Sequence, residues 1–140
     1  MYLNLKRMKY NIENCIGNRL RCLSRIVDKD FRSSLKAFDI TESQLSILFA
    51  LTKLGKVEQG EIGKTLVLER STVSRNVKLL EKREIIIKSA DYRPEIELTK
   101  KGHKLVQTLI PIWESLMDAL MDKLGNEGLQ NLETLEQKLK

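Results

Sequence analysis

The 140-residue sequence is poor in the residues that build metal sites and disulfide frameworks. It contains two cysteines, Cys15 and Cys22, seven positions apart and in no CxxC pair, and one histidine, His103. A structural zinc site needs four ligands, and two sulfurs separated by two helical turns lie about 10 Å apart along the helix axis, too far to bridge. We therefore expect no metal ion, no other cofactor and no internal disulfide.

Long apolar runs are lacking as well. No stretch of about 18 apolar residues occurs, so no transmembrane helix is predicted. Lys6, Arg7 and Lys9 lie where a signal peptide would need its apolar stretch. The sequence has no G-x-S-x-G, P-loop or H-E-x-x-H motif, which argues against an enzyme. A cytoplasmic protein without a membrane partner is the expectation.

Aromatic residues make up 5% of the chain, a low share that suits helices better than a β-sandwich. Hydrophobic residues amount to 41%, which is enough for a folded core in one domain spanning residues 1–140. Lys and Arg outnumber Asp and Glu by 25 to 19, giving a formal charge of +6. This excess favours a polyanionic partner, with nucleic acid ahead of an anionic membrane.

The two ends of the chain show helical periodicity. Apolar residues recur every three or four positions in residues 12–38, and again in a long segment that starts after Thr99 and is interrupted at Gly125 and Gly128. A bend is expected at Pro111, and Trp113 is assigned to a subunit contact. One subunit cannot easily cover both apolar faces. Residues 12–38 and 104–140 are therefore interpreted as a dimerisation stem.

The centre of the chain, residues 41–99, predicts a compact lobe. Thr41 with Gln44 forms a capping signal for a helix that ends near Gly55, and two shorter helices follow at residues 58–67 and about 70–82. The β-branched run 85–87 and the alternating run 96–98 predict a hairpin. The fold class is thus mainly α with a small β-hairpin wing: a winged helix-turn-helix carrying N- and C-terminal helices as its stem.

The helix at about 70–82 carries the strongest functional signal. One face is apolar, and the opposite face holds short hydroxyls and cations that suit the major groove of double-stranded DNA. The residues expected to bind DNA there are Arg70, Ser71, Thr72, Ser74, Arg75 and Lys78, with Asn76 on the same face. The alternative is a solvated surface helix with Ser71 as a cap and Arg75 in an ion pair.

An ordered set of motifs resembles the MarR family of bacterial transcription regulators. The motifs are T-x-x-Q at residues 41–44, S-T-V-S-R at 71–75, L-L-E-K-R at 79–83 and L-T-K-K-G at 98–102. The resemblance extends over residues 12–140. It implies a winged-helix homodimer on a pseudo-palindromic operator, modulated by a small-molecule effector held between lobe and stem.

The same resemblance makes Arg93, in the D-x-R pattern of Asp91 to Arg93, the wing residue that enters the minor groove. The chain departs from the family pattern in two places. Glu84 replaces the glycine that usually follows the recognition helix, so it must adopt a positive φ or leave the helix differently. The wing is a few residues shorter than usual, with Pro94 directly after Arg93.

Two alternative functions remain at this point. Some MarR relatives sense peroxide through a cysteine near the start of the first helix, which Cys15 approximates; basic neighbours such as Arg19 and Lys29 favour the reactive thiolate. A basic helical module that binds a protein or a membrane surface is the other alternative. It predicts charges on the terminal helices and a neutral central helix, whereas Arg70, Arg75, Lys78, Lys82 and Arg83 make the central helix basic.

Overall fold

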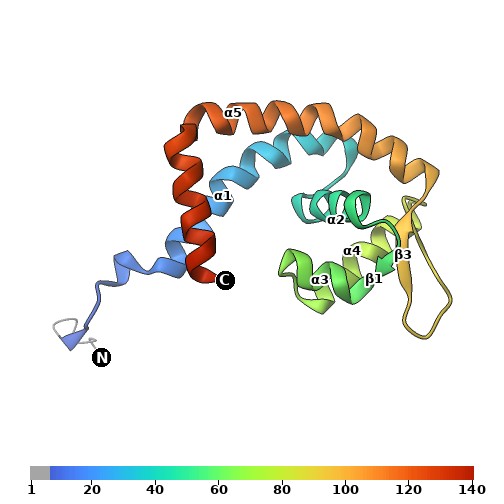
Figure 1. Cartoon of the computed structure of the whole chain (residues 1–140), viewed down its shortest axis with the longest axis horizontal. Coiled ribbons are helices and arrows are strands. Elements are labelled where there is room, and N and C mark those ends of the chain that lie inside the picture. Colours follow the sequence, from blue (N-terminus) through green and yellow to red (C-terminus); the bar gives the residue numbers. More distant parts are fainter. Residues whose placement is uncertain (1–6) are drawn as a thin grey trace.

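The computed structural model describes residues 7–140 and divides them into a lobe and a stem (Figure 1). The lobe contains three helices and three strands: α2 (Glu42–Leu54), β1 (Val57–Glu58), α3 (Gln59–Leu66), α4 (Arg70–Lys82), β2 (Ile86–Lys88) and β3 (Glu95–Leu98). The flanking segments are η2 (Ile12–Asn14), α1 (Ile16–Leu35), η3 (Lys36–Phe38) and α5 (Lys100–Leu139). The predicted fold class, a mainly helical winged helix, is confirmed.

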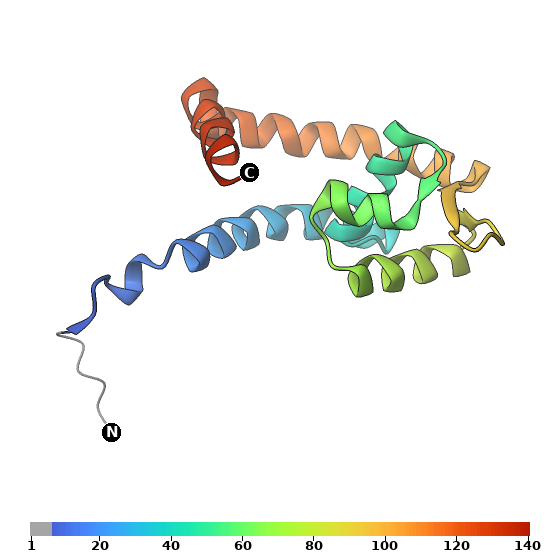
Figure 2. The same cartoon turned by 60° about the horizontal axis from the view of Figure 1, so that its bottom comes forward.

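The stem projects from one side of the lobe. Helices α1 and α5 leave the lobe together (Figure 1), and the second view shows that their far ends lie apart (Figure 2). The C-terminal part of α5 turns sharply away from the rest of the helix, at Gly125, where the backbone has φ 63° and ψ −176°. The interruption predicted at Gly125 is therefore confirmed. The backbone keeps helical dihedral angles through Pro111, and the bend expected at the proline stays a prediction.

The hydrophobic core lies in the lobe and where α5 crosses it. Its buried side chains come from the end of α1, from α2, α3, α4, β2 and β3, and from the first turns of α5: among them are Leu35, Leu45, Leu48, Ile62, Val77, Leu80, Ile96 and Leu109. Most of the stem contributes nothing to it. Large apolar side chains stay exposed along the stem, namely Ile12, Ile16, Leu23, Ile26, Leu124, Leu132, Leu135 and Leu139.

Helix caps fix the starts of α2 and α5. Thr41 and Gln44 form the predicted capping box of α2, with each side chain bonding the other's backbone N–H at 3.1–3.2 Å. Thr99 caps α5 by accepting from the N–H of Gly102, and its hydroxyl also donates to the carbonyls of Glu84 and Ile85. A side chain at Gly102 would overlap the carbonyl oxygen of Ile85, so this glycine allows α5 to pack on the lobe.

The sheet has the order β1-β3-β2, with both pairs antiparallel. The predicted hairpin is confirmed: Ile86 pairs with Leu98, and Lys88 with Ile96. Strand β1 was not predicted, because residues 57–58 are too short to show an alternating pattern, and Glu58 was expected in a helix. Val57 pairs with Ile96 and so anchors the start of α3 to the wing.

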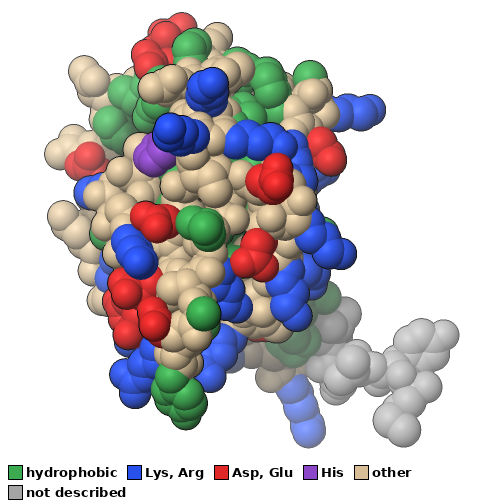
Figure 3. Space-filling model, turned by 90° about the vertical axis from the view of Figure 1, so that its right-hand side faces the viewer, with side chains coloured by type: hydrophobic (Ala, Val, Ile, Leu, Met, Phe, Trp, Pro, Cys, Tyr) green, Lys and Arg blue, Asp and Glu red, His purple; other side chains and the backbone are tan. Residues whose placement is uncertain are grey.

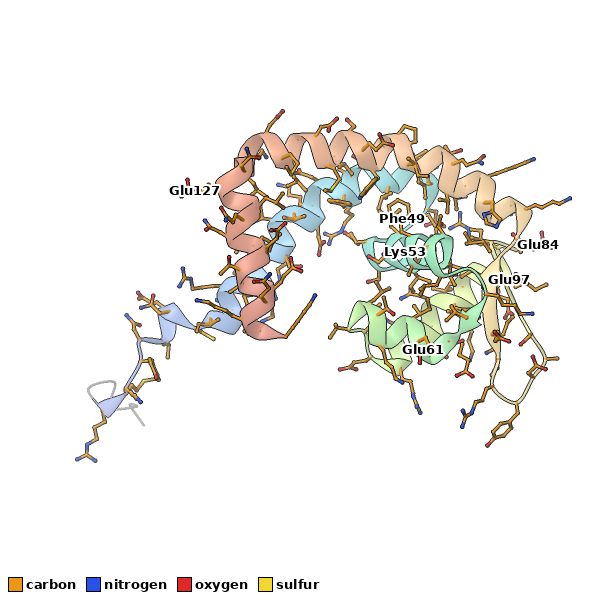
Figure 4. All side chains as sticks on the ribbon, viewed as in Figure 1. Phe49, Lys53, Glu61, Glu84, Glu97 and Glu127 are labelled. Atoms are coloured by element: carbon orange, nitrogen blue, oxygen red, sulfur yellow. The ribbon has the colours of Figure 1, made fainter. Side chains whose placement is uncertain are left out.

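One detail of the stem differs from the prediction. The segment 12–38 is not one helix, because Cys15 has extended ψ and separates η2 from α1, and the last turn tightens into η3. The ring of Trp113 packs against Phe49 of the same subunit in a T-shaped pair with ring centroids 5.3 Å apart, and its assignment to a subunit contact stays a prediction. Figure 4 shows Phe49 on the side of α2 that faces α5.

Candidate nucleic-acid interface

Helix α4 has a buried face and a charged face, as its periodicity predicted. Val73, Val77 and Leu80 are at most 2% exposed. On the other side lie the predicted contact residues: Arg70, Ser71, Arg75 and Lys78 are exposed, and Thr72 and Ser74 are half-buried. The N-cap residue, Glu69, makes no side-chain bond to the helix. The amino end of α4 can therefore offer backbone N–H groups to a phosphate.

The cations of this face are not neutralised within the subunit. Three ion pairs occur within residues 7–140: Arg32 with Glu42, Lys64 with Glu61, and Lys140 with Glu136. None includes a predicted DNA-binding residue. The ion pair proposed for Arg75 in the alternative interpretation is thus absent from the described part of the chain, which leaves its guanidinium free to bind an external partner.

A groove joins the recognition helix to the wing. It has a volume of about 940 Å³ and lies between α3, the start of α4 and the tip of the hairpin. Arg70 and Arg93, separated by 23 positions in sequence, both line it. Lys64, Gln59 and Tyr92 line it as well, and sequence reasoning missed all three. A single Lys or Gln in a short helix carries no distinguishing pattern, whereas Tyr92 could have been noted beside Arg93.

Hydrogen bonds hold the base of the wing, whereas the residues at its tip are exposed. Ser89 and Glu95 close the hairpin through two hydrogen bonds of 2.9 Å, and the carbonyl of Pro94 accepts from the N–H of Gln59 at 3.4 Å. Asp91 and Arg93 are exposed, and Tyr92 is fully exposed. The proline after Arg93 therefore ties the wing to α3 without covering the arginine.

Charge alone does not delimit the interface. Figure 3 views the end of the molecule that bears the wing, and Lys and Arg side chains are interspersed there with Asp and Glu. The groove itself contains Glu58, Glu61 and Glu69 beside its cations. The site is therefore defined by the arrangement of α4 and the wing rather than by a uniform basic surface.

Two residues near this face serve the fold instead. Asn76 was expected to face DNA, but it is 6% exposed, because its side chain turns inward to Gln44 of α2 and to the carbonyl of Thr72. Arg83, which was counted among the basic residues, donates to the carbonyls of Phe38 and Asp39 at 3.0 and 2.6 Å. It thereby fastens the end of α4 to the segment joining α1 and α2.

Both cysteines lie on the stem, away from this groove. Cys15 is the exposed N-cap residue of α1, and Cys22 is exposed within the same helix. Within residues 7–140 the only side-chain hydrogen bond of either sulfur runs from Cys22 Sγ to Asn18 Oδ1 at 4.0 Å. No tyrosine or cation of that region hydrogen-bonds the sulfur of Cys15, so the contacts do not favour a redox site. The same described region contains no cluster of three potential metal ligands, and none of its helices has the length and apolar character of a membrane span.

Comparison with known proteins gives this geometry a context. Residues 38–93, which run from η3 to the wing tip, match the MarR family model. Over these residues the chain is similar to the MarR family. The chain is also 25% identical over 99 residues to an uncharacterised HTH-type transcriptional regulator of Bacillus cereus, covering 70% of this chain and 67% of the relative.

Solved structures share nearly the whole MarR-family fold. BpsR of Bordetella bronchiseptica, whose DNA binding is regulated by 6-hydroxynicotinic acid, superposes with a TM-score of 0.84 at 20% identity, over 94% of this chain and 98% of BpsR. MepR of S. aureus, solved as a DNA complex, superposes with a TM-score of 0.78 at 26% identity, over 89% and 96%. The chain thus has the fold of MarR-family transcriptional regulators, which are not enzymes.

Proposed function

We propose that this protein is a sequence-specific DNA-binding transcriptional regulator that acts as a homodimer on a pseudo-palindromic operator. The observation that carries the proposal is that Arg70 of α4 and Arg93 of the wing, both exposed and without an ion pair within residues 7–140, line one groove. Helix α4 would enter the major groove with Arg70, Ser71, Thr72, Ser74, Arg75 and Lys78, and Arg93 would reach the minor groove or a phosphate. Such a regulator works in the cytoplasm.

The exposed apolar stem supports the dimer. Eight large apolar side chains of η2, α1 and α5 remain at least 37% exposed in the single subunit. Covering each fully would contribute about 1.5–3 kcal/mol, so pairing with a second copy is strongly favoured. A two-fold axis through the stem would place two α4 helices in successive major grooves, with half-sites about 10 bp apart.

A cavity in the stem supports the effector. It has a volume of about 230 Å³ and lies between α1 and α5, where Phe31, Leu116 and Leu120 form apolar walls and Ser34, Asp30 and Lys123 supply polar groups. Small apolar pockets with a few polar groups are typical ligand sites. BpsR responds to a small aromatic acid. We propose an effector of similar size; release of the protein from its operator by a panel of small aromatic acids tests this.

Selection from a random DNA library, followed by footprinting, tests DNA recognition directly. The protein should enrich an inverted repeat. Arg75→Ala should weaken operator binding by about 1–3 kcal/mol and relax preference at one base pair per half-site, because a bidentate base contact is lost.

Arg75→Lys serves as the matched control. It keeps the positive charge but lacks the planar guanidinium, so it should keep the salt dependence and still lose discrimination. Failure of the unmodified protein to enrich any sequence would refute operator binding. Unchanged affinity and preference in Arg75→Ala would show that α4 does not read bases in the proposed orientation.

A further inference from the structure

Two polar side chains are buried within the described part of the chain, and they bond to each other. Gln44 of α2 and Asn76 of α4 are each 6% exposed. Gln44 Nε2 donates to Asn76 Oδ1 at 3.3 Å. This bond joins the first turn of α2, at the junction with the stem, to the middle of the helix proposed to read DNA.

The pair belongs to a continuous chain of hydrogen bonds. At one end the N–H of Thr41 donates to Gln44 Oε1 at 3.1 Å, and at the other Asn76 Nδ2 donates to the carbonyl of Thr72 at 3.0 Å. Each amide therefore uses both its oxygen and its nitrogen. We name this set, Thr41, Gln44, Asn76 and the Thr72 carbonyl, the amide relay.

Stability does not require the bond between these two side chains. Removing one partner of a buried hydrogen bond is costly, but replacing both by apolar groups of similar shape is often neutral. The flanking residues of α4, Val73 and Val77, are apolar and equally buried. Leucine and methionine would fill the same space, so the relay needs another physical role.

A directional hydrogen bond can fix the rotation of a helix about its axis, which apolar packing alone does not fix. Contacts of Val73 and Val77 with the core are non-directional and tolerate small rotations of α4 about its axis. An α-helix with side chains has a radius of about 5–6 Å, so a rotation of roughly 20° moves a side-chain tip by about 2 Å. Hydrogen bonds to base edges vary by only about 0.5 Å in length, so such a shift would break a bidentate contact.

We propose that Gln44 and Asn76 are positioning residues for DNA recognition, whose buried bond fixes the rotation of α4 and thereby selects the side chains that enter the major groove. The inference rests on the proposed DNA-binding function. Neither residue touches DNA. Both act through Thr72 and its neighbour Arg75, which lie on the same turns of α4 as Asn76.

The test compares full-length variants in their ability to distinguish DNA sequences. The double variant Gln44→Met with Asn76→Leu replaces both amides by apolar groups of similar shape. Asn76→Ser leaves the capping box of α2 intact and keeps a hydroxyl for the Thr72 carbonyl, but it is too short to reach Gln44. Val77→Ala is the control, because it loosens the core at the next position of α4 without touching the relay.

The measured quantity is the ratio of Kd for a scrambled duplex to Kd for the selected operator, at one salt concentration. Both relay variants should lower this ratio about tenfold or more, the scale of one good base contact, with unchanged Kd for the scrambled duplex. The double variant loses the capping bond from the N–H of Thr41 to Gln44, so it should melt slightly earlier, by no more than Val77→Ala. Val77→Ala should melt earlier and keep the wild-type ratio.

The outcomes separate this inference from the function on which it rests. If the unmodified protein binds the scrambled duplex and the operator with the same Kd, operator recognition is refuted, and the inference with it. A wild-type preference that both relay variants retain overturns the inference alone. Equal loss of preference in Val77→Ala also overturns it, since general loosening would then explain the effect. If the double variant does not fold, Asn76→Ser decides the matter.

Discussion

Three residues other than glycine have a left-handed backbone within residues 7–140: Asp39, Val67 and Glu84, with φ of 52°, 55° and 59°. Each follows a helical segment and reverses the chain before the next element. Aspartate tolerates this conformation, whereas a β-branched valine and a glutamate crowd their own carbonyl groups, at about 1 kcal/mol or more. The family position that Glu84 occupies is usually glycine, and the structure shows that the backbone keeps the glycine-like conformation.

Glu84→Gly should therefore stabilise the protein by about 0.5–1 kcal/mol, since relief of the strain exceeds the added entropy of the unfolded chain. Urea unfolding followed by circular dichroism measures the change. Glu81→Gly is the matched control: Glu81 is exposed and helical, so glycine there should destabilise by about 0.5–1 kcal/mol. Equal destabilisation in both variants would contradict the strain assigned to Glu84.

Asn76 and Glu84 show which residue-level features the sequence could predict. The conflict at Glu84 could be predicted because the family that the sequence resembles usually has glycine at this position, directly after the recognition helix. The inward orientation of Asn76 was hidden, because an asparagine at the border of an apolar face suits either side. Its direction depends on Gln44, 32 positions earlier, and no local pattern connects the two.

At the scale of elements, the contact between α5 and the lobe depends on Gly102. Gly102→Ala should destabilise by about 1–3 kcal/mol, because its methyl group would overlap the carbonyl of Ile85, which also accepts from the N–H of Thr99. Thermal unfolding checks this. Gly60→Ala, in open space on α3, should be neutral or slightly stabilising. A neutral Gly102→Ala would mean that α5 can shift away from the lobe at little cost.

The contribution of the wing to DNA binding can be tested at Arg93. Arg93→Ala should weaken operator and non-specific binding alike and lower the salt slope of binding by about two per dimer, as expected for one lost phosphate contact in each subunit. Binding isotherms at several salt concentrations measure the slope. Lys104→Ala, an exposed charge on α5, should leave it unchanged. An identical slope in Arg93→Ala would mean that the short wing does not reach DNA.

Elements with strong periodicity or caps were predictable, and those defined by distant partners were not. Helices α2 and α4 and the hairpin follow from their apolar spacing and from Thr41. Strand β1 is two residues long and exists because Val57 meets Ile96 of the wing. The groove between Arg70 and Arg93 likewise depends on how α3, α4 and the wing pack, which separate elements do not reveal.

At the scale of the whole molecule, the stem should control both assembly and DNA binding. Leu132→Asp should weaken the dimer about a hundredfold, since each subunit would place an unpaired carboxylate in an apolar contact. Sedimentation measures this, and operator affinity should fall with it. Asn131→Asp adds the same charge at the neighbouring exposed position and should leave the dimer intact. A folded monomer of the unmodified protein at micromolar concentration would refute the stem assignment.

The two stem helices flank the lobe in sequence, and this arrangement determines the order in which the parts of the protein can fold during synthesis. The lobe is contiguous, but its core also takes Val106 and Leu109 of α5, so the lobe can fold only once residues through 109 have left the ribosome. The stem pairs α1, made before the lobe, with α5, made after it. The apolar side of α1 must therefore wait for its partner helix until the residues that follow the lobe have been made. Under the proposed function, a nascent lobe is folded before it can pair, and a single lobe would make only half of the operator contacts.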